Sequence, residues 1–104
     1  MKELLKSIEP LIQEELDRAN KKFPQFASSH EGYAVLLEEV EETKEEMSRL
    51  EVETKFLWQT VRGNNPFSYA EDIKRTATNL AAEAIQVAAM AQKFIDMLES
   101  KVTK

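Results

Sequence analysis

Hydrophobic residues recur at three- and four-residue spacings from Lys2 to Phe23, the pattern of one face of an α-helix. The apolar positions of this segment are Leu4, Leu5, Ile8, Leu11, Ile12, Leu16 and Ala19. Pro10 interrupts the pattern, because a proline inside a helix removes a backbone hydrogen bond and clashes with the preceding turn. The sequence predicts either a helix that starts near Ser7 or a longer helix kinked at Pro10. Pro24 ends it in both cases.

A second helix is predicted from about His30, after a short connector in which Ser28 and Glu31 have the spacing of a capping box. Its apolar stripe consists of Leu36, Val40, Met47, Leu50, Leu57, Trp58 and Val61. The stripe has a polar gap around Thr54, so the pattern fits one long helix or a helix broken between Arg49 and Glu53. The sequence Gly-Asn-Asn-Pro at 63–66 predicts a turn.

The third helix is predicted to begin near Ser68 and to continue toward the end of the chain. Its stripe consists of Ile73, Ala77, Leu80, Ala84, Val87, Ala91, Phe94, Leu98 and Val102. Seven alanines between positions 77 and 91 allow another helix to approach closely. The sequence therefore predicts an all-α fold, an elongated bundle of long antiparallel helices in a single domain spanning 1–104.

Helix length predicts self-association. A helix of about 33 residues is about 50 Å long, whereas a compact domain of about 100 residues has a radius of gyration near 13 Å. Apolar stripes of this length cannot cover each other fully within one hairpin. We expect two hairpins to pair into a symmetric bundle, so that the protein is a homodimer or a higher homo-oligomer.

Composition excludes several classes of function. The 104 residues carry a net charge of −5, which argues against nucleic acid and anionic membrane surfaces as partners. There is no cysteine and only one histidine, so thiolate sites and multi-histidine zinc sites are excluded. No apolar run is long enough to span a membrane, and the N-terminal segment lacks the apolar region of a signal peptide. We therefore expect a cytoplasmic protein.

Glutamates crowd the start of the second helix, with five of them between positions 38 and 45. Like-charged neighbours on a helix repel each other by a few tenths of a kcal/mol per pair. Either water screens these carboxylates or a cation lies among them. Glu39 with Glu42 and Glu38 with Glu42 form pairs three and four residues apart, and either pair has the spacing to chelate one ion.

Glu83 is the second acidic feature of interest. It lies within the sequence AAEAIQVAAMA, about 80° from the centre of the apolar stripe at 100° per residue. A carboxylate at a close helix contact costs several kcal/mol if it is buried without a partner. A cation bound between Glu83 and the acidic helix would satisfy it. Because the candidate ligands are all oxygen atoms, we expect this cation to be Mg²⁺ or Mn²⁺.

The sequence EEVEE at 38–42, followed by Glu83 in an alanine-rich helix, resembles the all-α nucleoside triphosphate pyrophosphohydrolases. That superfamily includes the MazG-like proteins and the dimeric dUTPases. Over residues 26–98 the chain is most similar to the short MazG-like proteins of phages and prophages. The resemblance implies that Glu39, Glu42 and Glu83 are metal ligands, with Glu38 completing the EExxE motif. Gln86 stands where the superfamily pattern has a metal-binding aspartate.

The resemblance also implies a reaction. Bound Mg²⁺ would neutralise a nucleoside triphosphate and activate a water molecule that attacks the α-phosphorus, releasing pyrophosphate. We assign proton transfer to Glu38 and Glu42 and metal binding also to Gln86. Lys93 is a candidate for substrate phosphate, the alternative being a solvated cation. Tyr33 is either a contact to the nucleobase or a core residue.

Two alternative functions and the role of one group of aromatic residues remain open at this stage. Glutamine is a weaker ligand than aspartate, so Gln86 also fits a helical-bundle protein that has lost catalysis and acts as a nucleotide-binding or protein-interaction module. A plain structural coiled coil would leave Glu83 unexplained. The aromatic residues that flank the predicted turn either stack on a nucleobase or seal the end of the bundle; they are Phe56, Trp58, Phe67 and Tyr69.

Overall fold

The computed structural model describes residues 1–63 and 66–102. These ranges contain three helices and no strand: α1 (Lys2–Lys22), α2 (Ser29–Arg62) and α3 (Phe67–Val102). The all-α prediction is confirmed. Of the predicted turn, Asn64 and Asn65 lie outside the described residues, as does the side chain of Val102 in the predicted stripe.

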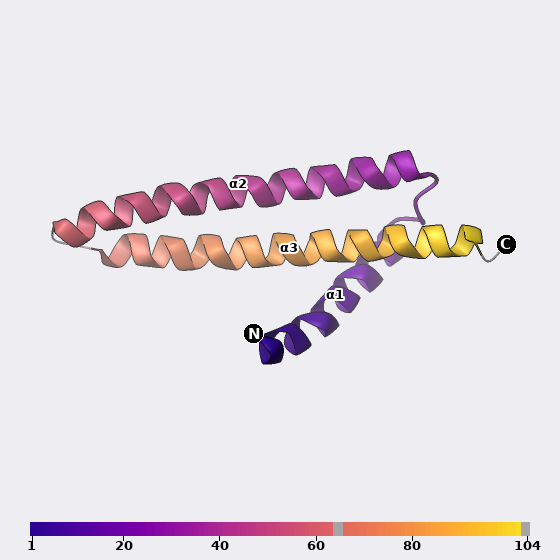
Figure 1. The fold of residues 1–104 in the computed structure, drawn as a ribbon, viewed down its shortest axis with the longest axis horizontal. Coiled ribbons are helices and arrows are strands. Elements are labelled where there is room, and N and C mark those ends of the chain that lie inside the picture. Colours follow the sequence, from indigo (N-terminus) through magenta and orange to yellow (C-terminus); the bar gives the residue numbers. More distant parts are fainter. Residues whose placement is uncertain (64–65, 103–104) are drawn as a thin grey trace.

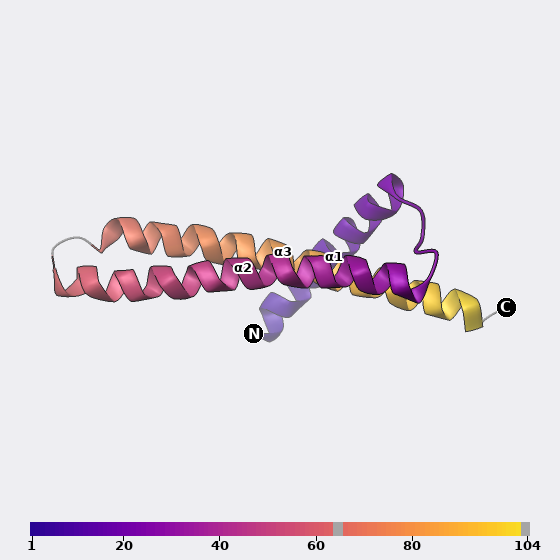
Figure 2. The same ribbon diagram turned by 90° about the horizontal axis from the view of Figure 1, so that it is seen from above.

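The three helices form an elongated molecule that measures 64 × 29 × 22 Å. Helices α2 and α3 run antiparallel and lie side by side over most of their length, and α1 crosses α3 obliquely (Figures 1 and 2). Helix α1 packs against α3 and not against α2. Within the described residues, no helix is long and apolar enough to cross a membrane.

Helix α1 runs without interruption through Pro10, so a start near Ser7 is ruled out and the longer of the two predicted helices is present. It ends at Lys22. Phe23 adopts an extended backbone (φ −134°, ψ 145°), because the following Pro24 disfavours the helical conformation in the residue before it.

Ser28 caps α2, as its position in the sequence predicts. Its hydroxyl oxygen accepts a hydrogen bond from the Glu31 backbone N–H at 3.2 Å. Glu31 accepts in return from the Ala27 N–H at 3.4 Å, one residue before the position that a capping box uses. From this cap α2 continues unbroken to Arg62. The polar gap does not break it, because the Thr54 hydroxyl donates to the Leu50 carbonyl within the same helix.

The core lies where all three helices and the α1–α2 connector meet. Its buried apolar side chains are Leu16, Phe26, Ala89 and Met97. Gly32 is buried there, and a Cβ at this position would lie 3.1 Å from the Phe26 ring and closer still to the Phe94 ring. The absent side chain therefore lets the start of α2 pack directly on these two rings.

The buried face of α3 differs from the stripe predicted for it. Thr76 and Lys93 are buried, whereas Ala77, Ala84 and Leu98 are exposed. The reason is that α1 and α2 contact α3 from different sides. The buried residues of α3 are therefore set by two neighbouring helices, whereas a single stripe assumes one.

The other part of the stripe lines an apolar groove between α2 and α3, with a volume of about 390 Å³. Its lining residues are Val40, Thr43, Lys44, Met47, Leu80, Ala84 and Val87, and none of them belongs to α1.

The contact at Gly32 makes a testable prediction. Gly32→Ala gains about 1 kcal/mol of helix propensity but must displace the Phe94 ring, and overpacking costs about 1–3 kcal/mol. We expect a net loss of about 1 kcal/mol and a decrease in Tm of about 5 °C in thermal unfolding followed by circular dichroism. Ser48→Ala, at an exposed position of α2, is the control and should leave Tm unchanged or slightly higher. An increase in Tm for Gly32→Ala would contradict the packing described.

Candidate functional site

Three carboxylates meet at the contact between α2 and α3. Glu39 and Glu42 lie one turn apart on α2, and Glu83 lies opposite them on α3. One carboxylate oxygen from each lies within 4.8 Å of the others, and all three residues are half-buried. We call Glu39, Glu42 and Glu83 the carboxylate cluster.

The carboxylate cluster is poorly satisfied by the described part of the chain. The Oε2 atoms of Glu39 and Glu83 are buried and have no hydrogen-bond partner there. Burial raises the pKa of the Glu39 carboxyl, and the charges of Glu42 and Glu83 raise it further. The pKa of Glu83 is raised by burial and then by Glu42. No lysine or arginine of the described residues forms an ion pair with any of the three.

These features fit a divalent cation. Magnesium and manganese prefer oxygen ligands, and a cluster of carboxylates with unpartnered oxygen atoms supplies them. The positive charge would also remove the repulsion that raises the two pKa values. Glu39, Glu42 and Glu83 are the residues that would hold such an ion.

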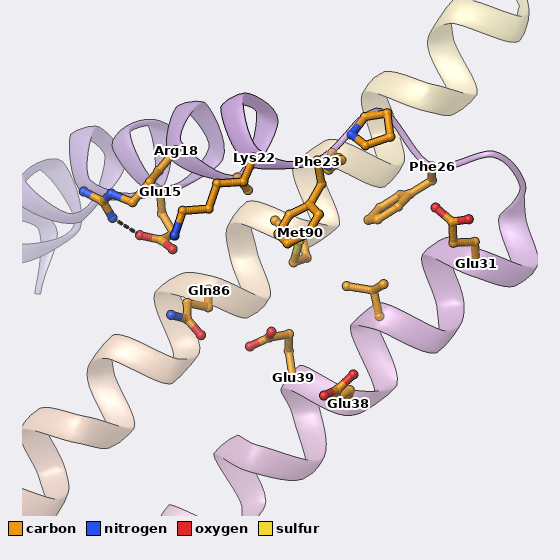
Figure 3. Close-up of a pocket in the computed structure, with 14 residues that line it drawn as sticks. Glu15, Arg18, Lys22, Phe23, Phe26, Glu31, Glu38, Glu39, Gln86 and Met90 are labelled. Carbon is orange, nitrogen blue, oxygen red and sulfur yellow. Dashed lines mark hydrogen bonds and ion pairs between the residues drawn. The ribbon is translucent and has the colours of Figure 1, made fainter.

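A cavity of about 540 Å³ adjoins the carboxylate cluster, between α1, α2 and α3 (Figure 3). Its walls are formed by Glu15, Arg18, Ala19, Lys22, Phe23, Pro24, Phe26, Glu31, Val35, Glu38, Glu39, Gln86, Met90 and Lys93. Glu39 belongs both to the cavity wall and to the cluster, so the two form one continuous region.

The structure brings together most of the residues that the sequence singled out. Glu38 is exposed and lines the cavity next to Glu39. Gln86 is half-buried, and its side chain and that of Glu39 extend toward each other from α3 and α2 (Figure 3). Tyr33 is the exception. It is 63% exposed, lines neither the cavity nor the core, and so does not take the core position offered as one alternative.

Lys93 is not a solvated cation, the alternative considered for it from the sequence. It is 2% exposed and lines the cavity. Its Nζ lies 5.0 Å from the centroid of the Phe26 ring. Its backbone carbonyl accepts a hydrogen bond from the Gln25 side chain at 3.1 Å, which ties the α1–α2 connector to α3.

Sequence reasoning missed the contribution of α1. Glu15 and Arg18, which form an ion pair with each other, line the cavity together with Lys22. The charge of Glu15 also adds to the rise in the pKa of Glu39. No sequence signal could have placed these residues, because the side of α3 on which α1 packs depends on tertiary contacts and not on the periodicity of α1.

Glu46 is a further partly buried carboxylate of α2, one that the sequence did not single out. Its side chain is 17% exposed, pairs with Arg49 at 2.8 Å and has a buried Oε2 without a partner among the described residues. A signal for this existed, because Glu46 follows Glu39 by seven residues and therefore lies on the same side of the helix.

The aromatic residues near the far end of the hairpin lie away from the cluster. Phe56 and Tyr69 stack on each other with ring centroids 5.7 Å apart, and Trp58 is 62% exposed. Trp58 follows Glu42 by sixteen residues on one unbroken helix, a rise of about 24 Å. At that distance Trp58 cannot stack on a base whose phosphates lie at the cluster of the same chain.

The raised pKa values predict that the cluster destabilises the metal-free protein. A carboxyl whose pKa is higher in the folded state keeps its proton to higher pH than in the unfolded chain. The free energy of unfolding therefore falls as pH rises from the ordinary glutamate range through the raised pKa values. We expect Glu83→Gln to raise the Tm of the metal-free protein slightly at neutral pH, because solvent screens part of the repulsion, with a gain that shrinks on acidification.

The measurement is thermal unfolding in a chelator across the pH range from mildly acidic to neutral. Glu41→Gln makes the same change of charge at an exposed position of α2 and should alter Tm little. A lower Tm for Glu83→Gln at neutral pH would mean that Glu83 already has a stabilising partner.

Comparisons of this chain with protein-family models, with curated proteins and with solved structures return no match. The site itself therefore carries what can be said of function: an unsatisfied carboxylate cluster lies beside a cavity with a buried lysine.

Proposed function

We propose that this protein is a Mg²⁺- or Mn²⁺-dependent nucleoside triphosphate pyrophosphohydrolase of the MazG-like type. It would convert an NTP or dNTP into the monophosphate and pyrophosphate. The observation that carries the proposal is the carboxylate cluster beside a cavity of about 540 Å³, in which two oxygen atoms have no partner among the described residues. Cavities of about 300–1,000 Å³ are the usual size of small-molecule sites.

The roles of the residues follow from their positions. Glu39, Glu42 and Glu83 would hold the cation, which when bound neutralises phosphate charge and lowers the pKa of a coordinated water. The oxygen of water forms a bond to the α-phosphorus as the bond from that phosphorus to the bridging oxygen breaks, and pyrophosphate leaves. The proton of the water passes to a carboxylate, for which Glu42 in the cluster and Glu38 in the cavity wall are the candidates.

Gln86 supports a second candidate function. It lines the cavity at the position where the MazG-like pattern has an aspartate, and its carboxamide is a neutral and weaker ligand than a carboxylate. The same fold would then bind a nucleotide, or a partner protein, without turnover. We rank this function second, because the carboxylate cluster is assembled without a contribution from Gln86.

We also propose that a second copy of the chain covers the apolar groove. Val40 and Met47, which line it, are 46% and 47% exposed, and further large apolar side chains are exposed along α1 and α2. The groove runs between two helices of 34 and 36 residues, so symmetric pairing of two hairpins lets each cover an apolar surface of matching length.

The catalytic proposal predicts pyrophosphate release from a panel of NTPs and dNTPs that requires Mg²⁺ or Mn²⁺. Glu42→Gln and Glu83→Gln should each lower the rate by about 100-fold or more, because each removes an anionic ligand. Glu41→Gln is the matched control and should retain the activity. Gln86→Asp adds an anionic ligand and should tighten metal binding.

Metal binding is measured separately from turnover, as the rise in Tm with added cation. A cation at 100 times its Kd stabilises the folded protein by about 2.7 kcal/mol. Stabilisation without pyrophosphate release would favour the second candidate function. Neither stabilisation nor release would contradict both functions.

The proposed dimer predicts that a charge in the groove separates the subunits. Met47→Glu would bury a carboxylate in an apolar interface, and sedimentation equilibrium should then give the mass of one chain. Val52→Glu makes a similar change at a 50% exposed position of α2 outside the groove and should leave the dimer intact. A wild-type protein with the mass of one chain would contradict the proposal.

A further inference from the structure

Lys93 is a buried lysine whose ammonium group forms no ion pair within the described part of the chain. Its side chain is 2% exposed, and none of the ion pairs or side-chain hydrogen bonds among the described residues involves its ammonium group. The Phe26 ring, 5.0 Å away, recovers only part of the hydration that an ammonium loses on burial. The Nζ atom is not among the fully buried polar atoms that lack a partner, so it reaches the space of the cavity and is available there to an anionic ligand.

The position of Lys93 relates it to the carboxylate cluster. It follows Gln86 by seven residues, two turns of α3, and both side chains line the same cavity. The Nζ of Lys93 lies over the Phe26 ring, at the end of the cavity away from Gln86 and Glu39 (Figure 3). The cavity therefore has the Glu39 carboxylate beside Gln86 toward one end, and the ammonium group of Lys93 beside the Phe26 ring toward the other (Figure 3).

The other charged residues of the cavity wall, which include Glu38 and Glu39, form no ion pair with this ammonium group within the described part of the chain. Glu15 is paired with Arg18, and Glu31 accepts a hydrogen bond from the Ala27 N–H. Lys22 of α1 also lines the cavity and forms no ion pair among the described residues. Lys22 and Lys93 thus add positive charge from two different helices.

We propose that this cavity contains an oligophosphate subsite in which Lys93 is the principal counter-charge and Lys22 a second, outer one. An oligophosphate fits the charge pattern, because one end can meet a cation held by the carboxylates while the other end meets the lysines. Assigning this anion to the β- and γ-phosphates of a nucleoside triphosphate rests on the proposed function. The anion subsite itself does not, since it depends on Lys93 and not on turnover.

The test is isothermal titration calorimetry of the protein with inorganic tripolyphosphate. The titration is carried out once in the presence of a chelator and once with Mg²⁺. We expect Lys93→Met to weaken binding by about tenfold or more, since it removes a buried charge pair. Lys93→Arg keeps the charge and should retain most of the affinity, and Lys22→Met should weaken binding less. Lys74→Met, at an exposed position of α3 that does not line the cavity, should bind like the wild type.

Stability provides a readout that separates ligand binding from packing. If Lys93 is kept for an anion, Lys93→Met removes an ammonium group that has lost much of its hydration and has no ion-pair partner among the described residues. It should then raise the Tm of the ligand-free protein, while tripolyphosphate no longer raises it. If Lys93 only packs against Phe26, Lys93→Met should lower Tm and leave the effect of tripolyphosphate unchanged.

Two results would overturn the inference: no binding of tripolyphosphate by the wild type under either condition, or equal binding by wild type and Lys93→Met. Failure of the proposed function gives a different result. Tripolyphosphate binding that depends on Lys93, without pyrophosphate release from any nucleotide, would keep the anion subsite and reject the pyrophosphohydrolase. Pyrophosphate release that is unaffected by Lys93→Met would keep the pyrophosphohydrolase and reject the anion subsite at Lys93.

Discussion

The electrostatic repulsion among Glu39, Glu42 and Glu83 is the constraint on which the rest of the site depends. The packing of α2 against α3 holds three carboxylates within 4.8 Å of one another. Burial and mutual repulsion raise the pKa of Glu39 and of Glu83, and each keeps an oxygen atom without a partner among the described residues. Part of the stability gained from α2–α3 packing is therefore offset by a charge arrangement that only a proton or a cation relieves. That trade-off is typical of binding and catalytic sites and not of structural contacts.

Much of the fold could be predicted from the sequence, because helices and their ends depend on the residues close to them in the chain. Periodicity defines the three helices, Ser28 marks the start of α2, and the spacing of Glu39 and Glu42 places both on one side of it. Glu83 could be paired with them because a carboxylate among alanines at a helix contact is costly unless a counter-charge meets it. The question of a break in α2 could not be settled in advance, since a threonine that bonds within the helix and one that ends it look alike in a sequence.

What could not be predicted depends on α1. Its periodicity reveals an apolar face but not the helix against which that face packs. By crossing α3, α1 forms the third wall of the cavity and contributes Glu15, Arg18 and Lys22 to it. Lys93 lines the same cavity and is buried there beside the Phe26 ring, not placed on a free surface. A lysine in an amphipathic helix is assigned to solvent by default, and only tertiary structure reveals the exception.

Gln86, compared with an aspartate, and Lys93 both make the charge of the cavity wall less negative. An aspartate at position 86 would place a further negative charge beside Glu39, whose pKa is already raised by burial and by its acidic neighbours. Glutamine supplies an oxygen atom there without that charge. Lys93 adds a fixed positive charge to the same wall of the cavity. If the protein is a pyrophosphohydrolase of the proposed MazG-like type, the glutamine at this position would favour one bound cation over two. The phosphate charge that a second metal ion would neutralise would then be left to the ammonium group of Lys93.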